Sequence, residues 1–224
     1  MIITTWNCNL KLKSKYDHIE SLGSDILIIQ ECEKLKQDYF PNTQYFWTGR
    51  DESKGLGVLV KKDTAKISKL HNQNFIHFLP IETDGLNIMG VWAFNHRAVK
   101  YGEDANGRTM EAINYYDAWL KDSQKSIFAG DFNNSIIWDK TSNPDFNNIN
   151  NKLNLLGYES SYHKKTQDIF GKEKETTFYH TKKEDKKYHI DYIYTKEMNI
   201  KSLDIGLYDN WIKHSDHCPV SIKV

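Results

Sequence analysis

Cysteine is scarce in this sequence of 224 residues. Cys8, Cys32 and Cys218 stand far apart, and no two of them have the C-x-x-C spacing of a zinc knuckle. This scarcity argues against a disulfide framework and against a structural zinc site. We therefore expect three buried, unpaired thiols that pack as small apolar side chains.

An excess of either charge is also missing, because thirty basic and thirty acidic residues give a formal net charge of zero. Proteins that coat nucleic acid without sequence preference usually carry a basic excess, since neutralised phosphates supply most of their affinity. The neutral balance argues against that class. It is compatible with an enzyme that contacts a few phosphates and uses a metal ion for the remaining charge.

Long apolar runs are absent as well. No stretch approaches the ~18 apolar residues of a membrane span, and the first residues lack the basic-then-apolar pattern of a signal peptide. We therefore expect a cytoplasmic protein with no membrane partner. The sequence leaves its oligomeric state open.

What is present is a globular composition, with 39% apolar and 13% aromatic residues and no internal repeat or flexible linker. It predicts one α/β domain over residues 1–224. Continuous or alternating apolar runs predict strands, and apolar residues at helical spacing predict helices. The expected strands lie at 2–6, 25–30, 57–60, 86–94, 126–129, 176–179, 189–194 and 219–224, and the expected helices at 14–22, 110–120 and 146–156.

Polar side chains follow several of these apolar runs at the point where each strand ends. Glu31 follows the second strand, and Asp131 and Asn133 follow the strand at 126–129. Asn7 and Asn9 close the first strand and alternate onto one of its faces. One carboxylate after a strand means little, but neighbouring strand ends converge, so we expect these side chains to lie together.

Five short motifs extend this pattern: W-N-C-N at 6–9, I-Q-E at 29–31, G-D-F-N at 130–133, H-I-D-Y at 189–192 and S-D-H-C-P at 215–219. In this order they resemble the endonuclease/exonuclease/phosphatase superfamily. That superfamily includes exonuclease-III-like abasic-site nucleases, pancreatic-type DNases, sphingomyelinases and inositol-polyphosphate 5-phosphatases. The resemblance implies a DNase-I-like four-layer α/β sandwich, in which two packed mixed β-sheets are flanked by helices.

The resemblance also implies hydrolysis of a phosphoester with Mg2+ or Mn2+. A phosphodiester is anionic, so its hydrolysis needs a cation that neutralises developing charge and polarises water. Mg2+ prefers oxygen ligands, and one or two carboxylates seat it. The implied metal residues are Glu31 as a direct ligand, Asn9 beside it, and Asp216, which contacts a second ion or reaches the first through water.

Catalytic roles follow from the same resemblance. Asp131 orients or deprotonates the attacking water, and Asn7 and Asn133 hydrogen-bond that water or the phosphate. His217 lies against the scissile phosphate, where it stabilises the transition state or acts as an acid. Asp191 hydrogen-bonds His217 and raises the pKa of its imidazole toward the charged form.

Four further residues are expected near the substrate. His96 matches a histidine that many members place on the phosphate, and Arg108 either anchors the substrate or caps its helix. Phe178 and Tyr188 fall where abasic-site nucleases form the pocket for the deoxyribose. The segments at 97–107 and 134–151 are the expected rim loops.

Three functions remain open. The first is a nuclease acting on DNA or oligonucleotides, and the second is a phosphatase or phosphodiesterase for a small phosphorylated metabolite or a lipid headgroup. The third is a non-catalytic binding module on a decayed enzyme scaffold. The complete set of motifs disfavours the third, because decay would be expected to remove Glu31, Asp131 or His217 first.

Overall fold

The computed structural model describes residues 1–61, 64–94, 108–141 and 145–224. Its centre is a pair of six-stranded sheets, each of which contains both parallel and antiparallel neighbours. In the first sheet the strands lie in the order β13 (Ser202–Ile205), β14 (Val220–Lys223), β1 (Ile2–Asn7), β2 (Ile26–Cys32), β4 (Lys54–Val60) and β3 (Gln44–Asp51). In the second sheet the order is β5 (Lys66–Ile67), β6 (Phe78–Thr83), β7 (Leu86–Trp92), β8 (Ser126–Asp131), β12 (Asp191–Lys196) and β9 (Glu159–Ser160).

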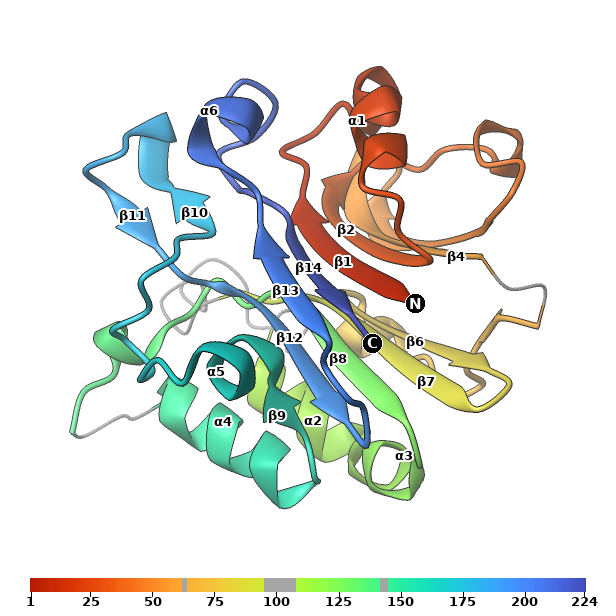
Figure 1. The fold of residues 1–224 in the computed structure, drawn as a ribbon. Coiled ribbons are helices and arrows are strands. Elements are labelled where there is room, and N and C mark those ends of the chain that lie inside the picture. The colour runs from red at the N-terminus through yellow and green to blue at the C-terminus, as the bar shows by residue number, and fades with distance from the viewer. Residues whose placement is uncertain (62–63, 95–107, 142–144) are drawn as a thin grey trace.

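Helices lie outside both sheets (Figure 1). The first sheet is covered by α1 (Tyr16–Ser21) and a preceding 3-10 turn, and the second by α2 (Thr109–Tyr115), α3 (Asp117–Asp122) and α4 (Asp145–Leu155). The remaining helices are α5 (Ser161–Thr166) and α6 (Tyr208–Trp211), and a two-stranded hairpin is formed by β10 (Phe178–Tyr179) and β11 (Lys187–Tyr188). The expected four-layer α/β sandwich is therefore confirmed.

Side-chain alternation explains why three apolar layers separate the four structural layers. In β2, Ile26 and Ile28 face the second sheet, whereas Leu27 and Ile29 face α1. A strand that is buried on both faces reads as a continuous apolar run, as β2 does. The third layer joins the second sheet to its helices through side chains such as Phe128 of β8.

The cysteines behave as expected. Cys8 and Cys32 lie in the layer beneath α1, Cys218 lies between the sheets, and all three are buried and unpaired. Burial raises the pKa of the Cys32 and Cys218 thiols to about 12, which keeps them protonated and unreactive.

Two expected elements differ in the structure. The helix expected at 110–120 is interrupted at Tyr116, whose backbone leaves the helical region and whose buried hydroxyl accepts a hydrogen bond from the backbone N–H of Asn72. The strand expected at 189–194 begins only at Asp191, because the N–H groups of Ile190 and Asp191 both donate to the hydroxyl of Thr177. Within the described residues, no helix is long and apolar enough to cross a membrane.

Candidate active site

A hydrogen bond between the two sheets marks one rim of the sandwich. Asn7 ends β1 of the first sheet, and its Nδ2 donates to Oδ2 of Asp131, which ends β8 of the second sheet, at 2.9 Å. The same Nδ2 lies 3.3 Å from Oε1 of Glu31. Asn7 therefore connects two carboxylates that are 100 residues apart in the sequence.

Strand alternation explains why these side chains face each other. Asn7 shares a face of β1 with Ile3, and Asp131 shares a face of β8 with Ala129, and both faces point into the layer between the sheets. Asp191 is the register partner of Asp131 on the neighbouring strand. Its carboxylate therefore enters the same space.

Glu31 reaches the rim only because its strand is irregular. Regular alternation would place Glu31 with Ile29 on the outer face of the first sheet. The register between β2 and β4 shifts between Gln30 and Cys32, and Glu31 adopts a φ of 57°. A left-handed conformation costs a side-chain-bearing residue about 1 kcal/mol, so the surrounding contacts must hold it.

The two other predicted asparagines also hold carboxylates and also adopt left-handed backbone, with φ of 50° at Asn9 and 48° at Asn133. Asn133 donates to Asp131 twice, from its backbone N–H at 2.8 Å and from Nδ2 at 3.0 Å. Nδ2 of Asn9 donates to Oδ1 of Asp216 at 2.9 Å. Asparagine tolerates this backbone region better than most residues, which suits it to these turns.

The expected contact between Asp191 and His217 is present. Nδ1 of His217 lies 2.9 Å from Oδ2 of Asp191, and the two side chains are only 5% and 1% exposed. Thr177 joins the segments that carry them, because its hydroxyl accepts from the N–H of Asp191 at 3.1 Å and its carbonyl from the N–H of Cys218 at 2.8 Å. Sequence analysis did not single out Thr177, since an isolated threonine carries no signal.

Burial and charge set the protonation of this group. Burial, with the Asp191 carboxylate beside it, raises the pKa of Asp131 to about 7. Burial alone would lower the pKa of His217, but the charge and hydrogen bond of Asp191 outweigh it and raise that pKa to about 9. At neutral pH His217 is therefore an imidazolium between two carboxyl groups.

Two sets of side chains could hold a metal ion. Ligand atoms of Asp131, Asp191 and His217 lie within 4.8 Å of one another. A histidine ligand must present a lone pair, however, and the raised pKa of His217 keeps both of its ring nitrogens protonated at neutral pH, with Nδ1 bonded to Asp191. This trio suits proton handling better than metal binding.

The second set is the predicted one, Glu31, Asn9 and Asp216, which offer carboxylate and amide oxygens. Asn9 bonds Asp216, and the N–H of Leu10, the next residue, donates to the carbonyl of Glu31 at 3.0 Å. The side chain of Glu31 is 21% exposed, so its carboxylate is accessible while Asn7 holds one of its oxygens. Hard cations such as Mg2+ prefer this donor chemistry and keep several waters. The residues present therefore fit a divalent cation.

Lys54 is a neighbour that sequence analysis missed. Its Nζ lies 2.9 Å from Oε2 of Glu31 and 5.0 Å from the centroid of the Trp92 ring. Lys54 begins β4, and the preceding strand β3 was not among the expected elements. Without the β3–β4 hairpin, no pattern in the sequence predicts that Lys54 lies near Glu31.

Aromatic rings continue from His217 along one side of the site. Phe178 forms an isolated β-bridge with His217, and their ring centroids lie 4.5 Å apart. Tyr188 lies 6.3 Å from Phe178 in a stacked orientation, and Trp138 lies 5.2 Å from Tyr188. The structure thus brings Phe178 next to His217 and Tyr188 next to Phe178, with Trp138 from the expected rim segment beyond them.

One predicted residue that the structure describes, Arg108, does not join this group of contacts. Arg108 occupies the N-cap position of α2, where its carbonyl accepts from the N–H of Ala112 at 3.1 Å, but its side chain makes no capping hydrogen bond. Its Nη1 lies 3.2 Å from Oε1 of Glu111, its buried Nε has no hydrogen-bond partner in the described part of the chain, and it lines a cavity of about 210 Å³ with Asn134. His96 and the segment 97–107 lie outside the described residues.

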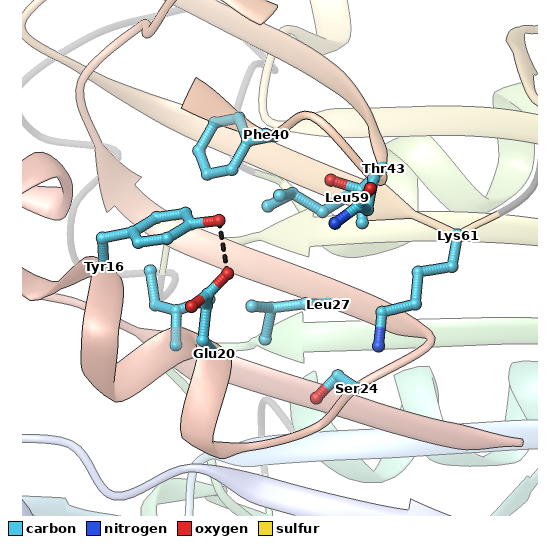
Figure 2. Close-up of a pocket in the computed structure, with 10 residues that line it drawn as sticks. Tyr16, Glu20, Ser24, Leu27, Phe40, Thr43, Leu59 and Lys61 are labelled. Atoms are coloured by element: carbon cyan, nitrogen blue, oxygen red, sulfur yellow. Dashed lines mark hydrogen bonds between the residues drawn. The ribbon is translucent and has the colours of Figure 1, made fainter. Parts of the chain in front are cut away.

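A separate pocket of about 330 Å³ lies on the outer face of the first sheet. Figure 2 shows Lys61 opposite the hydrogen-bonded pair of Tyr16 and Glu20, with Leu27 between them. Its lining contains none of the predicted site residues. The carboxylate–imidazole rim, and not this pocket, is therefore the candidate active site.

Comparisons with solved structures agree with the fold. The 3' phosphatase NExo from Neisseria, bound to product DNA hairpin, has a TM-score of 0.75 and 20% identity, with 100% of this chain and 98% of that chain covered. The 3'-5' exonuclease NExo from Neisseria meningitidis has a TM-score of 0.74 and 20% identity, with 100% of this chain and 99% of that chain covered. An AP endonuclease from Archaeoglobus fulgidus has a TM-score of 0.76 and 16% identity, with 100% of this chain and 98% of that chain covered.

Sequence comparisons add the family. A search of curated proteins found no match. The model of the Endonuclease/Exonuclease/phosphatase family matches residues 4–217, a span that contains each side chain of the rim described above. The chain therefore belongs to the endonuclease/exonuclease/phosphatase family, whose members are hydrolases of phosphoesters.

Proposed function

We propose that this protein is a Mg2+- or Mn2+-dependent phosphodiester hydrolase that acts on DNA or oligonucleotides. The observation that carries the proposal is the continuous line of contacts from Glu31 through Asn7 to Asp131. The Asp191–His217 pair lies on the far side of Asp131. This line supports the assignment of Glu31 to the cation, Asp131 to the base and His217 to the charged donor.

The charges at the rim explain the need for a cation. Four carboxyl groups gather there, and an anionic phosphate would be repelled by them. Glu31, Asn9 and Asp216 would hold the cation through oxygen atoms. When bound, the cation supplies neutralising charge and a polarised oxygen nucleophile.

Asp131 is the group that we assign to the attacking water. Its two oxygens accept hydrogen bonds from Asn7 and Asn133, which fix the plane of the carboxylate. A pKa of about 7 matches a base that works near neutral pH. We therefore assign to Asn7 and Asn133 the role of orienting the carboxylate of Asp131.

His217 is assigned to the phosphate. Nδ1 is engaged by Asp191, which leaves Nε2 as the donor toward a phosphoryl oxygen or a leaving group. A donor that is already charged and oriented stabilises developing negative charge without rearrangement. Asp191 keeps the ring in this tautomer and in its charged form.

DNA is favoured over a small phosphorylated metabolite by the aromatic side of the rim. Phe178, Tyr188 and Trp138 form a row beside His217, and bases stack on such rings with little sequence preference. The similar structures are those of a 3' phosphatase bound to product DNA hairpin, a 3'-5' exonuclease and an AP endonuclease. A phosphatase or phosphodiesterase for a metabolite or lipid headgroup is the alternative, which the neutral net charge favours.

The test is a substrate panel with the full chain. Plasmid DNA, an abasic duplex, a single strand, a 3'-phosphorylated oligonucleotide and two p-nitrophenyl phosphates would be incubated with EDTA, Mg2+ or Mn2+. We expect turnover of a DNA substrate that disappears with EDTA and returns with either metal. His217→Ala should lose at least ~100-fold in turnover, the scale of a positioned acid or charged donor. Turnover of the small esters alone would favour the alternative, and metal-independent turnover would contradict the proposal.

A further inference from the structure

Lys54 occupies a position that the roles above leave unexplained. Its ammonium lies 2.9 Å from Oε2 of Glu31, the oxygen that Asn7 does not hold. The lysine side chain is 40% exposed, so it has room to change partner. A surface lysine is usually a solvated charge, but this one neutralises the carboxylate to which we assign the cation.

The second contact of Lys54 is with Trp92, which lies closer to Asp131. Its Nζ lies over the ring of Trp92, and Trp92 is the register partner of Asp131 on the adjacent strands β7 and β8. Both residues face the layer between the sheets at its rim. The ammonium is therefore held between the carboxylate of Glu31 and an aromatic ring that adjoins Asp131.

Two cations cannot share one carboxylate oxygen without repulsion. A divalent ion bound at Glu31 would displace the ammonium of Lys54 from Oε2. The displaced ammonium would remain near the rim, where the phosphate of a substrate offers a new anionic partner. Lysine binds phosphate well as a compact charge on a flexible stem.

We propose that Lys54 competes with the divalent cation for Glu31 and, once displaced, binds a non-bridging oxygen of the substrate phosphate. The inference rests on the proposed function, because it uses the cation and the phosphoester assigned there. It adds a coupling between the two ligands. The cation displaces Lys54 from Glu31 and so frees it for the phosphate, and the phosphate draws Lys54 away from Glu31 and so frees that carboxylate for the cation. Linkage then requires that each tightens the binding of the other.

The test compares Lys54→Met with Lys34→Met in the full chain. Lys34 pairs with Glu52 at 2.8 Å, so its removal reproduces the loss of one ion-paired positive charge without removing the contact to Glu31. Mn2+ affinity would be measured without substrate by electron paramagnetic resonance. We expect Lys54→Met to bind Mn2+ about fivefold more tightly, the scale of one partly exposed ion pair, and Lys34→Met less than about twofold.

Substrate binding should move in the opposite direction. For the DNA substrate, Lys54→Met should raise KM about tenfold at saturating Mg2+, and Lys54→Arg, which keeps the charge, should restore most of the affinity. Thermal melting of each variant establishes that it is folded. Unchanged or weaker Mn2+ affinity in folded Lys54→Met would overturn the competition, and an unchanged KM would overturn phosphate binding.

The two proposals fail in different ways. If the wild-type chain hydrolyses no phosphoester but Lys54→Met still binds Mn2+ more tightly, the proposed function is wrong and the competition at Glu31 stands. If DNA is hydrolysed but Lys54→Met shows neither change, the function stands and the role of Lys54 is refuted.

Discussion

Replacing Asp191 by asparagine should change the protonation of His217 more than any other single substitution. The side chain keeps its shape but loses the charge that holds the buried imidazolium. Without that charge, burial becomes the dominant influence on His217 and should bring its pKa from about 9 to 6.5 or below. This difference corresponds to about 3 kcal/mol of interaction between the ring and the carboxylate.

The sign of the stability effect follows from the raised pKa. A histidine whose pKa is higher in the folded state stabilises the protein fully below its unfolded pKa, near 6.5, and this contribution is lost as the pH rises through about 9. We therefore expect Asp191→Asn to lower the free energy of unfolding by about 3 kcal/mol at pH 6 and by much less at pH 10.

Nitrogen-detected spectra of the histidine rings, recorded in EDTA, would follow the titration of His217 directly. The control is Glu173→Gln, which removes the carboxylate from another buried pair, His163 and Glu173 at 3.2 Å. This control should leave the His217 titration in place. A wild-type midpoint at or below 6.5, or a midpoint that does not move in Asp191→Asn, would refute the reasoning.

Two further predictions concern the substrate side of the rim and the strand that ends in Asp131. Phe178→Ala removes the ring that lies 4.5 Å from His217. The lost stacking, about 1–3 kcal/mol, should raise KM for single-stranded DNA by roughly 5- to 150-fold, whereas KM for bis-p-nitrophenyl phosphate should hardly change. Equal losses on both would assign Phe178 to the orientation of His217 instead. Gly130→Ala should destabilise the fold by about 3 kcal/mol or more in urea unfolding, because Gly130 has a φ of 154° and a Cβ would lie 1.8 Å from the carbonyl oxygen of Val91. An unfolding free energy within 1 kcal/mol of wild type would mean that β7 and β8 separate easily there.

Much of the fold could be predicted because its central strands carry strong patterns. β1, β2 and β8 are apolar runs buried on both faces, and the polar residues that end them mark where the rim lies. Their order along the chain was sufficient to suggest the superfamily. The contact between Asp191 and His217 followed from the resemblance, not from the strands.

Other elements carried weaker patterns. β6 contains Pro80, which has no N–H for a ladder and argues against a strand. β13 lies at the edge of the first sheet and is only four residues long, so its alternation of Ser202, Leu203, Asp204 and Ile205 is too short to stand out. Glu173 lies in the charged segment 172–175, whose composition is typical of a solvated loop, yet its side chain is only 6% exposed and pairs with His163.

The position of Glu31 shows why the site itself is harder to derive than the sheets. Alternation is a rule for regular strands, and it would direct Glu31 toward α1, away from Asn7 and Asp131. The irregularity between β2 and β4 reverses that direction at the cost of a left-handed backbone at Glu31. Asn9 and Asn133 show the same departure where they hold Asp216 and Asp131. Carboxylates that repel one another are thus brought together where the backbone leaves its regular path, and a pattern based on regular strands is least informative at those residues. The hydrogen bonds of these asparagines and the charge of Lys54 offset the repulsion between the carboxylates and hold the strained backbone in place. The arrangement of the rim therefore lowers the stability of the fold in return for bringing these groups together.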